Sequence, residues 1–416
     1  MCPGNENPTN NSPSQSSPRS ASAPSASQPR TADGPHGSGS DSSGSPHVVA
    51  GQVGEAGDYD EVPVPIVVDN DSAIWHEDDT RDDDNASVFS DTDSAYESLA
   101  GSSRTGSITS SIYNYVYENG RRYHAYRSGQ YVLPNDEAEQ ERLDLQHHIW
   151  RLLLHGGLYT APLNIPAEES DAWGRPVGDF RILDLGTGTG IWAIDMAEEF
   201  PQASVFGIDL SPIQPDWVPP NCRFHVDDYE DDWTYREDEK FDYIHGRALS
   251  GTVSDWARFY RQVRTHLKPG GWCEMQEYDA WIFSDDDSFE RAVWTKNWVE
   301  KLDEASQMYG KRLNVARFHK QWMIEAGFED VQEKMFRIPI GPWAKDPHLK
   351  ELGRYEQLHM QMSVASHTPA LFSRVWHYTP QQCQVTIEGV KNEFRNPNLR
   401  LITQYRFIIG RSPGPP

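Results

Sequence analysis

The chain has 416 residues, and its 63 acidic side chains against 37 basic ones give a formal net charge of −26. A chain this acidic is not expected to bind nucleic acid, because affinity for phosphates comes mainly from Lys and Arg. It contains no run of 18 apolar residues, and its first residues have neither a basic nor an apolar region, so we expect no membrane span and no signal peptide.

Residues 1–112 differ in composition from the rest of the chain. They hold 18 Asp and Glu against four Arg and no Lys, and they are crowded with Ser, Pro and Gly. Such a segment buries too little apolar surface to offset its conformational entropy, so we predict a disordered acidic tail. Serines among the acidic residues at 87–98 fit either a phosphorylatable interaction tail or a solubilising leader.

The four cysteines are Cys2, Cys222, Cys273 and Cys383, and no two of them have CxxC spacing. Scattered cysteines indicate reduced thiols, not a disulfide framework or a zinc site. We therefore expect a cytoplasmic and/or nuclear protein that holds no metal.

Residues 113–160 are predicted to form an N-terminal helical cap. An aromatic-rich stretch at 113–126 ends the low-complexity region, and apolar residues at helical spacing predict a helix over 136–154. Asn135 is the expected N-cap, and the glycines at 156–157 are expected to end the helix.

Residues 161–280 alternate between short apolar runs and amphipathic segments, which predicts an α/β core. The expected strands are 181–185, 205–209, 222–226, 241–245 and 272–277, and the expected helices are 191–200 and 255–267. Strands that alternate with helices imply a parallel sheet with right-handed crossovers.

Residues 281–416 change to a mostly helical pattern with two late strands. We predict helices over 287–309, 315–326, 346–363 and 379–394, and strands over 331–339 and 400–410. About 60 residues, mostly helical, thus separate the last two strands.

A glycine-rich turn, Asp184-Leu-Gly-Thr-Gly-Thr-Gly190, joins the first core strand to a helix. Gly186 permits the tight turn, Gly188 lets a ligand approach the backbone, and Gly190 lets the helix pack closely. A dinucleotide fingerprint would require its third glycine at position 191, which is Ile191, and no Lys follows the turn as in a P-loop. A nicotinamide oxidoreductase is therefore an unfavoured alternative.

Two further acids follow the next two strands. Asp209 ends the second strand, where a carboxylate can accept both ribose hydroxyls of a nucleoside. Asp228, or its neighbour Asp227, follows the third strand, where an adenine amino group would lie. Each acid could instead be an ordinary loop or turn residue, but together with Asp184 they predict an adenosine site without phosphates.

The sequence resembles the class I S-adenosylmethionine-dependent methyltransferases, and more narrowly the fungal LaeA-like and TAM-domain methyltransferases. The resemblance is carried by residues 122–127, 133–137, 142–144, 183–195, 209–215, 242–247 and 267–272. It implies a Rossmann-like seven-stranded sheet whose last two strands form an antiparallel hairpin, with S-adenosyl-L-methionine as the cofactor. The helical cap and a helical insertion would cover the substrate side.

Residues at the family's cofactor-binding positions are carried over one by one. They are Asp184, Gly186, Thr187, Gly188, Gly190, Asp209, Leu210, Asp228 and Tyr229. Tyr123, Tyr126 and Tyr131 could form a lid over adenosine or substrate, or could simply pack in the cap.

Methyl transfer in this class depends mainly on in-line positioning, with a base added when the nucleophile must lose a proton. His245, at the end of the fourth strand, is the candidate base, although it could equally orient the cofactor loop. Glu274 and Glu277 are further candidates, on opposite faces of the fifth strand.

The sequence thus predicts a methyltransferase that acts on a small-molecule or protein acceptor, with a possible link to fungal secondary metabolism. The alternative is a cofactor-binding regulator that works through protein partners with little or no catalysis.

Overall fold

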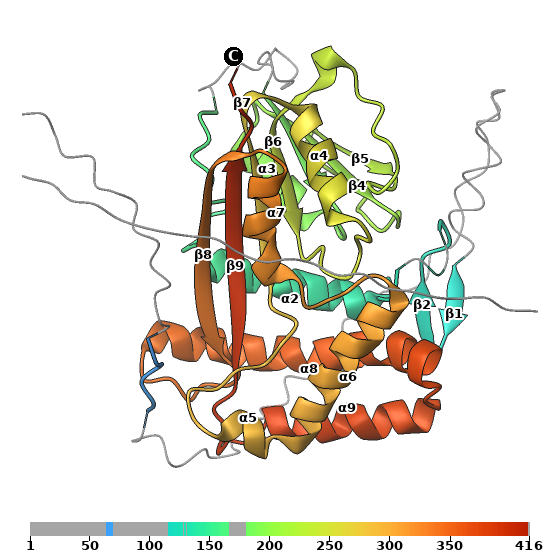
Figure 1. The fold of residues 1–416 in the computed structure, drawn as a ribbon, viewed down its shortest axis with the longest axis vertical. Helices are drawn as coiled ribbons and strands as arrows, with labels where there is room; N and C mark the ends of the chain where they lie inside the picture. Colours follow the sequence, from blue (N-terminus) through green and yellow to red (C-terminus); the bar gives the residue numbers. More distant parts are fainter. Residues whose placement is uncertain (1–63, 70–114, 128, 130, 166–179, 415–416) are drawn as a thin grey trace, which may run out of the picture. The chain divides into compact units, whose positions relative to one another are not determined.

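The computed structural model describes residues 64–69, 115–127, 129, 131–165 and 180–414. Its centre is a seven-stranded sheet with the spatial order β5-β4-β3-β6-β7-β9-β8 (Figure 1). The strands are β3 (Arg181–Leu185), β4 (Ser204–Asp209), β5 (Cys222–Val226), β6 (Phe241–Arg247), β7 (Leu267–Tyr278), β8 (Glu329–Pro339) and β9 (Ile402–Arg411).

The first five strands of this sheet are parallel, whereas β9 lies antiparallel between β7 and β8. The predicted Rossmann-like seven-stranded sheet with a terminal antiparallel pair is therefore confirmed. β7 begins five residues before the predicted strand, at Leu267 instead of Trp272.

Helices cover both faces of the sheet and form a separate layer beyond it. They are α2 (Glu137–Leu153), α3 (Ile191–Glu199), α4 (Trp256–His266), α5 (Ser288–Arg291), α6 (Val293–Tyr309), α7 (His319–Glu325), α8 (Pro347–Trp376) and α9 (Pro380–Phe394), with 3₁₀ turns η1 (Glu237–Glu239) and η2 (Ala316–Phe318). Among the described helices, none is both long and apolar enough to cross a membrane.

Side chains that alternate along the strands build the two faces. Ile182 packs with Trp192 of α3 on one face, while Leu183 packs with Phe259 of α4 on the other. This three-layer arrangement follows from the period of two along a strand.

The helical layer contains α6, α8 and α9, with α2 lying between α8 and the sheet (Figure 1). β8 and β9 extend from the sheet toward this layer. Helices α8 and α9 lie between these two strands in the chain, which confirms the predicted helical insertion. The predicted helix 287–309 is interrupted at Ala292, which separates α5 from α6.

Helix α8 continues to Trp376, so the predicted end at Ser363 was wrong. Pro369 lies inside α8, and proline cannot donate the helical hydrogen bond to the carbonyl of Ala365. Arg121 replaces that bond, since its Nη1 donates to the Ala365 carbonyl oxygen at 3.2 Å. A partner 244 residues distant in sequence cannot be seen in the local pattern.

The N-terminal cap begins with a two-stranded hairpin that the prediction of a helical cap missed. Strands β1 (Val116–Glu118) and β2 (Arg121–Tyr123) are joined by Asn119 and Gly120, both with positive φ. An Asn-Gly pair is a strong hairpin signal. Asp136, not Asn135, caps α2, because its carboxylate accepts the Glu139 N–H at 3.1 Å.

Most of the predicted acidic tail lies outside the described residues, as do its serines at 87–98 and Cys2. Residues 64–69 are described, and they lie along the loop between β8 and α8. Val68 forms an antiparallel bridge with Ala344, and the Lys345 N–H donates to the Val67 carbonyl at 2.8 Å. Ile66 and Val68 pack against Trp343, so this short apolar segment contacts the folded domain.

Candidate functional site

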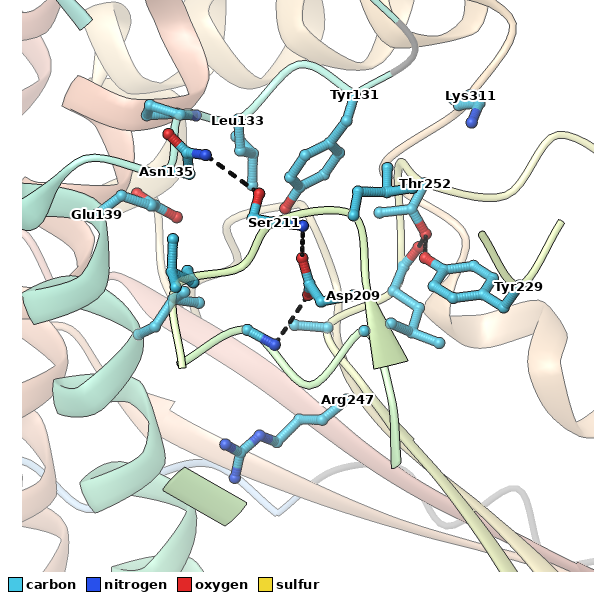
Figure 2. Close-up of a pocket in the computed structure, with 18 of the residues that line it drawn as sticks. Tyr131, Leu133, Asn135, Glu139, Asp209, Ser211, Tyr229, Arg247, Thr252 and Lys311 are labelled. Atoms are coloured by element: carbon cyan, nitrogen blue, oxygen red, sulfur yellow. Dashed lines mark hydrogen bonds between the residues drawn. The ribbon is translucent and has the colours of Figure 1, made fainter. Parts of the chain in front are cut away.

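A cavity of about 890 Å³, counted to its open mouth, lies at the carboxyl ends of β3, β4 and β6. Helix α2 and residues 131–135 form its opposite wall (Figure 2). The lining includes Tyr131, Leu133, Asn135, Glu139, Arg142, Gly186, Gly188, Asp209, Leu210, Ser211, Asp228, Tyr229, Arg247, Leu249, Thr252, Tyr278 and Lys311.

The glycine turn forms part of the cavity wall. Gly186 and Gly188 have φ of 63° and 58°, in the left-handed region that favours glycine. A Cβ on Gly186 would lie only 2.7 Å from a Leu249 methyl carbon. Gly190 does not line this cavity; it faces Phe224, whose ring would lie 2.5 Å from an added Cβ. Gly190 therefore serves close packing between α3 and the sheet.

Asp209 joins the end of β4 to the glycine turn. Its carboxylate accepts the Gly188 N–H at 2.9 Å and the Ser211 N–H at 2.8 Å (Figure 2). Burial raises the pKa of Asp209 to about 6, although the backbone hydrogen bonds from Ser211 and Gly188 lower it. The side chain is thus held at the cavity wall by two fixed donors.

Leu210, Asp228 and Tyr229 lie together on the cavity wall at the ends of β4 and β5. The Tyr229 hydroxyl donates to Thr252 Oγ1 at 2.5 Å (Figure 2). Asp228 is buried, and its Oδ1 accepts the Glu230 N–H at 2.9 Å. The structure therefore brings six of the nine predicted cofactor residues to one cavity: Gly186, Gly188, Asp209, Leu210, Asp228 and Tyr229.

Asp184 and Thr187 line a smaller adjoining cavity of about 390 Å³ on the other side of the glycine turn. Thr187 Oγ1 donates to Asp184 Oδ2 at 2.6 Å, which stabilises the turn. The two cavities share Gly186, Gly188 and Arg247 in their walls. Asp184 and Thr187 therefore do not line the main cavity but lie behind the glycine turn, in the wall of the smaller one.

His245 lies away from both cavity linings, so the structure does not place it as the predicted base. Its side chain is fully buried and stacks on Trp192 with the ring centroids 3.7 Å apart. Its Nδ1 lies 2.7 Å from Asp184 Oδ1. This geometry corresponds to the alternative stated above, a histidine that orients the cofactor loop through Asp184.

Glu274 and Glu277 also fail to reach the cavity as bases. Glu274 accepts hydrogen bonds from the backbone of Thr160 and Ala161 and from the Tyr243 hydroxyl. Glu277 accepts the N–H groups of Leu249 and Ser250. Burial raises the pKa of Glu277 to about 7. Each carboxylate fixes a loop, and they do lie on opposite faces of β7 as predicted.

Of the three predicted lid tyrosines, Tyr131 alone lines the cavity (Figure 2). Burial raises the pKa of its hydroxyl well above the usual value. Tyr123 is buried in the helical core with Arg374 over its ring, and Tyr126 lies beside Arg127. The structure does not bring these two to the cavity.

Sequence reasoning missed a buried ion pair on α2 that faces the cavity. Arg142 donates to Glu139 Oε1 at 2.7 Å, and both side chains are 2% exposed. Glu139 Oε2 and Gln146 Nε2 are buried without a hydrogen-bond partner. In the sequence, Glu139 and Arg142 look like an ordinary surface pair at i,i+3, because the helix that buries them is distant in sequence.

Arg247 contributes a positive charge to the shared wall of the two cavities. Burial lowers the pKa of its guanidinium to about 10, which still leaves it charged near neutral pH. Its Nη1 lies 3.0 Å from His147 Nδ1, and the guanidinium carbon lies over the Trp150 ring. A fixed cation and the Gln146 Nε2 group, which has no hydrogen-bond partner, can together receive a carboxylate.

Comparison with known proteins gives relatives over most of the folded chain. A family model described as a methyltransferase domain matches residues 141–333. Methyltransferase pytC of Aspergillus terreus is 39% identical over 76% of this chain and 94% of its own length. The secondary metabolism regulator LAE1 of Cochliobolus heterostrophus is 38% identical over 72% of this chain and 95% of its own.

A third relative is named protein-methionine methyltransferase laeA, from Emericella nidulans. It is 34% identical over 71% of this chain and 76% of its own length. These matches extend beyond the nucleotide-binding core into the cap and the helical layer. The sheet order and the glycine turn described above agree with them. The chain therefore belongs to the class I S-adenosylmethionine-dependent methyltransferases, in their fungal LaeA-like branch.

Proposed function

We propose that this chain binds S-adenosyl-L-methionine in the main cavity and transfers its methyl group to an acceptor. One observation carries the proposal: Asp209, Asp228 and the glycine turn line one cavity, and the opposite wall holds Glu139, whose buried Oε2 has no hydrogen-bond partner. A buried polar atom without a partner costs free energy, so a ligand that satisfies it gains affinity.

Different residues of the cavity suit the ribose, the adenine and the methionine carboxylate of this cofactor. Asp209 would accept the ribose hydroxyls, and Leu210, Asp228 and Tyr229 would hold the adenine. Arg247 and the free Gln146 amide would bind the methionine carboxylate, next to the Asp184–Thr187 pair. His245 would act as a positioning residue that fixes Asp184.

The bound cofactor supplies an electrophilic methyl group, so the chain needs mainly to align the acceptor and exclude water. Glu139 is the residue we assign to the acceptor side. Its Oε2 is free to accept a proton or a hydrogen bond, while Arg142 fixes its Oε1. We propose Glu139 in place of His245 as the base for an acceptor that must lose a proton.

The relatives suggest where this activity is used. One of them is named a protein-methionine methyltransferase and another a secondary metabolism regulator. A thioether sulfur loses no proton on methylation, so such an acceptor would not need a base. We propose a role linked to secondary metabolism, with regulation through protein partners as the second candidate because of the regulator's name.

Isothermal titration of the full chain with S-adenosyl-L-methionine tests the proposal. We expect saturable binding, and Asp209→Ala should weaken it at least about tenfold, the loss of one charge-assisted hydrogen-bond pair. Asp216→Ala, an exposed acid seven residues further on, is the matched control and should bind as the unchanged protein does. Absence of binding heat at millimolar ligand would contradict the proposal.

A further inference from the structure

A second, narrow cavity, of about 440 Å³ counted to its open mouth, adjoins the main one behind Tyr278. We propose that it is the acceptor subsite and takes a compact, flat, largely apolar molecule with a neutral hydrogen-bond donor at its far end. This inference rests on the proposed function, because the main cavity must hold the methyl donor.

The second cavity lies between the end of β7 and helices α6 and α8. Apolar groups dominate its lining, among them Trp281, Ile282, Trp298, Val299, Leu302 and Met360. Aromatic and aliphatic walls with a few placed polar groups are typical of sites for small organic molecules. Many of these residues belong to the helical layer and none to the cofactor motifs.

The Tyr278 side chain stands between the two cavities. Tyr278 lines both, and its hydroxyl lies 3.1 Å from His367 Nε2. Beside it, Arg142 Nη1 lies 2.9 Å from His359 Nε2, which connects the Glu139 pair to the second cavity. Burial lowers the pKa of His367 to about 4, so its ring is neutral near pH 7 and Nε2 can accept a hydrogen bond from the Tyr278 hydroxyl. An acceptor in this cavity would present its nucleophile at Tyr278, toward Glu139.

Asp279, which lines both this cavity and a third one, is an acid with an unused acceptor atom. Asp279 is 4% exposed, and its Oδ1 is buried without a hydrogen-bond partner. Its Oδ2 accepts from Arg406 Nε at 2.9 Å. Because Arg406 already balances the charge of Asp279, the free Oδ1 suits a neutral donor better than a second cation.

A third cavity, of about 570 Å³, shares Asp279 and Trp281 with the second. Its other lining residues are mainly polar: Phe283, Asp303, Asn314, Arg317, Gln404 and Arg406. The three cavities thus form a series from a polar compartment, past Asp279, through the apolar one to Tyr278. This order gives the acceptor a polar end at Asp279 and a reacting end at Tyr278.

The test uses the full chain saturated with S-adenosylhomocysteine, which carries no methyl group to transfer. The probes are 6-amino-2-naphthol and 2-naphthol, titrated while quenching of tryptophan fluorescence is followed, since Trp281 and Trp298 line the cavity. We expect both probes to bind saturably. The amino compound should bind about fivefold more tightly, because its amino group can donate to Asp279 while its hydroxyl lies at Tyr278, whereas 2-naphthol has one donor for the two ends.

Two variants locate the binding. Val299→Phe fills the cavity and should weaken both probes at least about tenfold while leaving S-adenosylhomocysteine affinity within about twofold. In Asp279→Asn, Arg406 holds the amide oxygen and turns the NH₂ group toward the cavity, so the advantage of the amino probe should disappear. Ile387→Phe enlarges a residue of the same helical core outside the cavity and should leave both probes unaffected.

The outcomes are separable. Binding of S-adenosylhomocysteine without saturable binding of either probe would overturn the acceptor subsite and leave the proposed function standing. Probe affinities unchanged by Val299→Phe would also overturn it. If Val299→Phe does not fold, Asp279→Asn decides, because an undiminished preference for the amino probe contradicts the assigned orientation. Absence of S-adenosylhomocysteine binding to the unchanged chain would contradict the proposed function instead.

Discussion

The Asp209 carboxylate accepts the backbone N–H of Gly188 at 2.9 Å. This bond joins the end of β4 to the left-handed glycine of the turn, so the acid and the turn form one rigid unit. A second bond from the Ser211 N–H fixes the same carboxylate from the other side. A ligand that binds Asp209 therefore meets a preformed site.

Cofactor affinity should depend on pH through Asp209. Its pKa is raised to about 6 by burial, and the ribose hydroxyls prefer the ionised carboxylate. The dissociation constant of S-adenosylhomocysteine should be constant above about pH 7 and rise as pH falls below 6, approaching tenfold per unit. Titration calorimetry between pH 5 and pH 8 measures this. Asp209→Asn should bind weakly at every pH, and a variant that retained the same pH dependence would exclude Asp209 as its source.

Removing one partner of the Glu139–Arg142 pair should lower the free energy of unfolding far more than replacing both partners with apolar residues. Arg142→Met leaves the Glu139 charge buried, which should lower the free energy of unfolding by about 3–5 kcal/mol. The double variant Glu139→Leu, Arg142→Met should recover most of that loss. Urea denaturation measures both variants. Arg236→Met, at an exposed ion pair with Asp238, is the control and should cost less than about 1 kcal/mol. A double variant as unstable as Arg142→Met alone would contradict this account.

The apolar segment 64–69 should stabilise the folded domain. Val68→Asp places a charge against Trp343 and Ala344 and should lower the free energy of unfolding by about 1–3 kcal/mol. Val67→Asp is the matched control, because Val67 is 67% exposed and its side chain should tolerate the charge. Thermal melting of the full chain compares the two. Equal melting temperatures would show that the contact contributes nothing.

Acid should destabilise the fold partly through buried histidine. Burial lowers the pKa of His319 to about 3, whereas the unfolded chain protonates it near 6.5. Between these values the unfolded state binds the extra proton, so stability is fully present above about pH 6.5. As pH falls below that value, the free energy of unfolding should decrease by about 1.4 kcal/mol per pH unit. His319→Gln should show a shallower loss between pH 6 and pH 4, and the exposed control His225→Gln should not. Parallel curves for all three proteins would rule out this contribution.

Local patterns predicted the core because its signals are local. The alternation of Ile182 and Leu183 between two faces, and the strand–turn–helix around Gly186, both lie within a few residues of one another. These patterns identified the sheet, its helices and four of the residues that meet in one cavity, Gly186, Gly188, Asp209 and Asp228. The resemblance to the methyltransferase family added Leu210 and Tyr229.

What the sequence did not reveal depends on distant partners. Pro369 is typical of a helix end, and only the contact with Arg121 explains why α8 continues. His245 was predicted to end a strand, as a base could, but β6 continues to Arg247 and Trp192 of α3 stacks on the imidazole ring. The role of Glu139 depends on its burial by α8, and the spacing of apolar residues along α2 does not reveal that burial.

A crystal structure with S-adenosylhomocysteine bound tests most directly whether the main cavity holds the cofactor through Asp209. We expect both ribose hydroxyls within hydrogen-bond distance of the Asp209 carboxylate, and the adenine between Leu210 and Tyr229. We also expect the methionine carboxylate at Arg247 and Gln146. A ligand bound elsewhere, or in this cavity without contact to Asp209, would contradict this assignment.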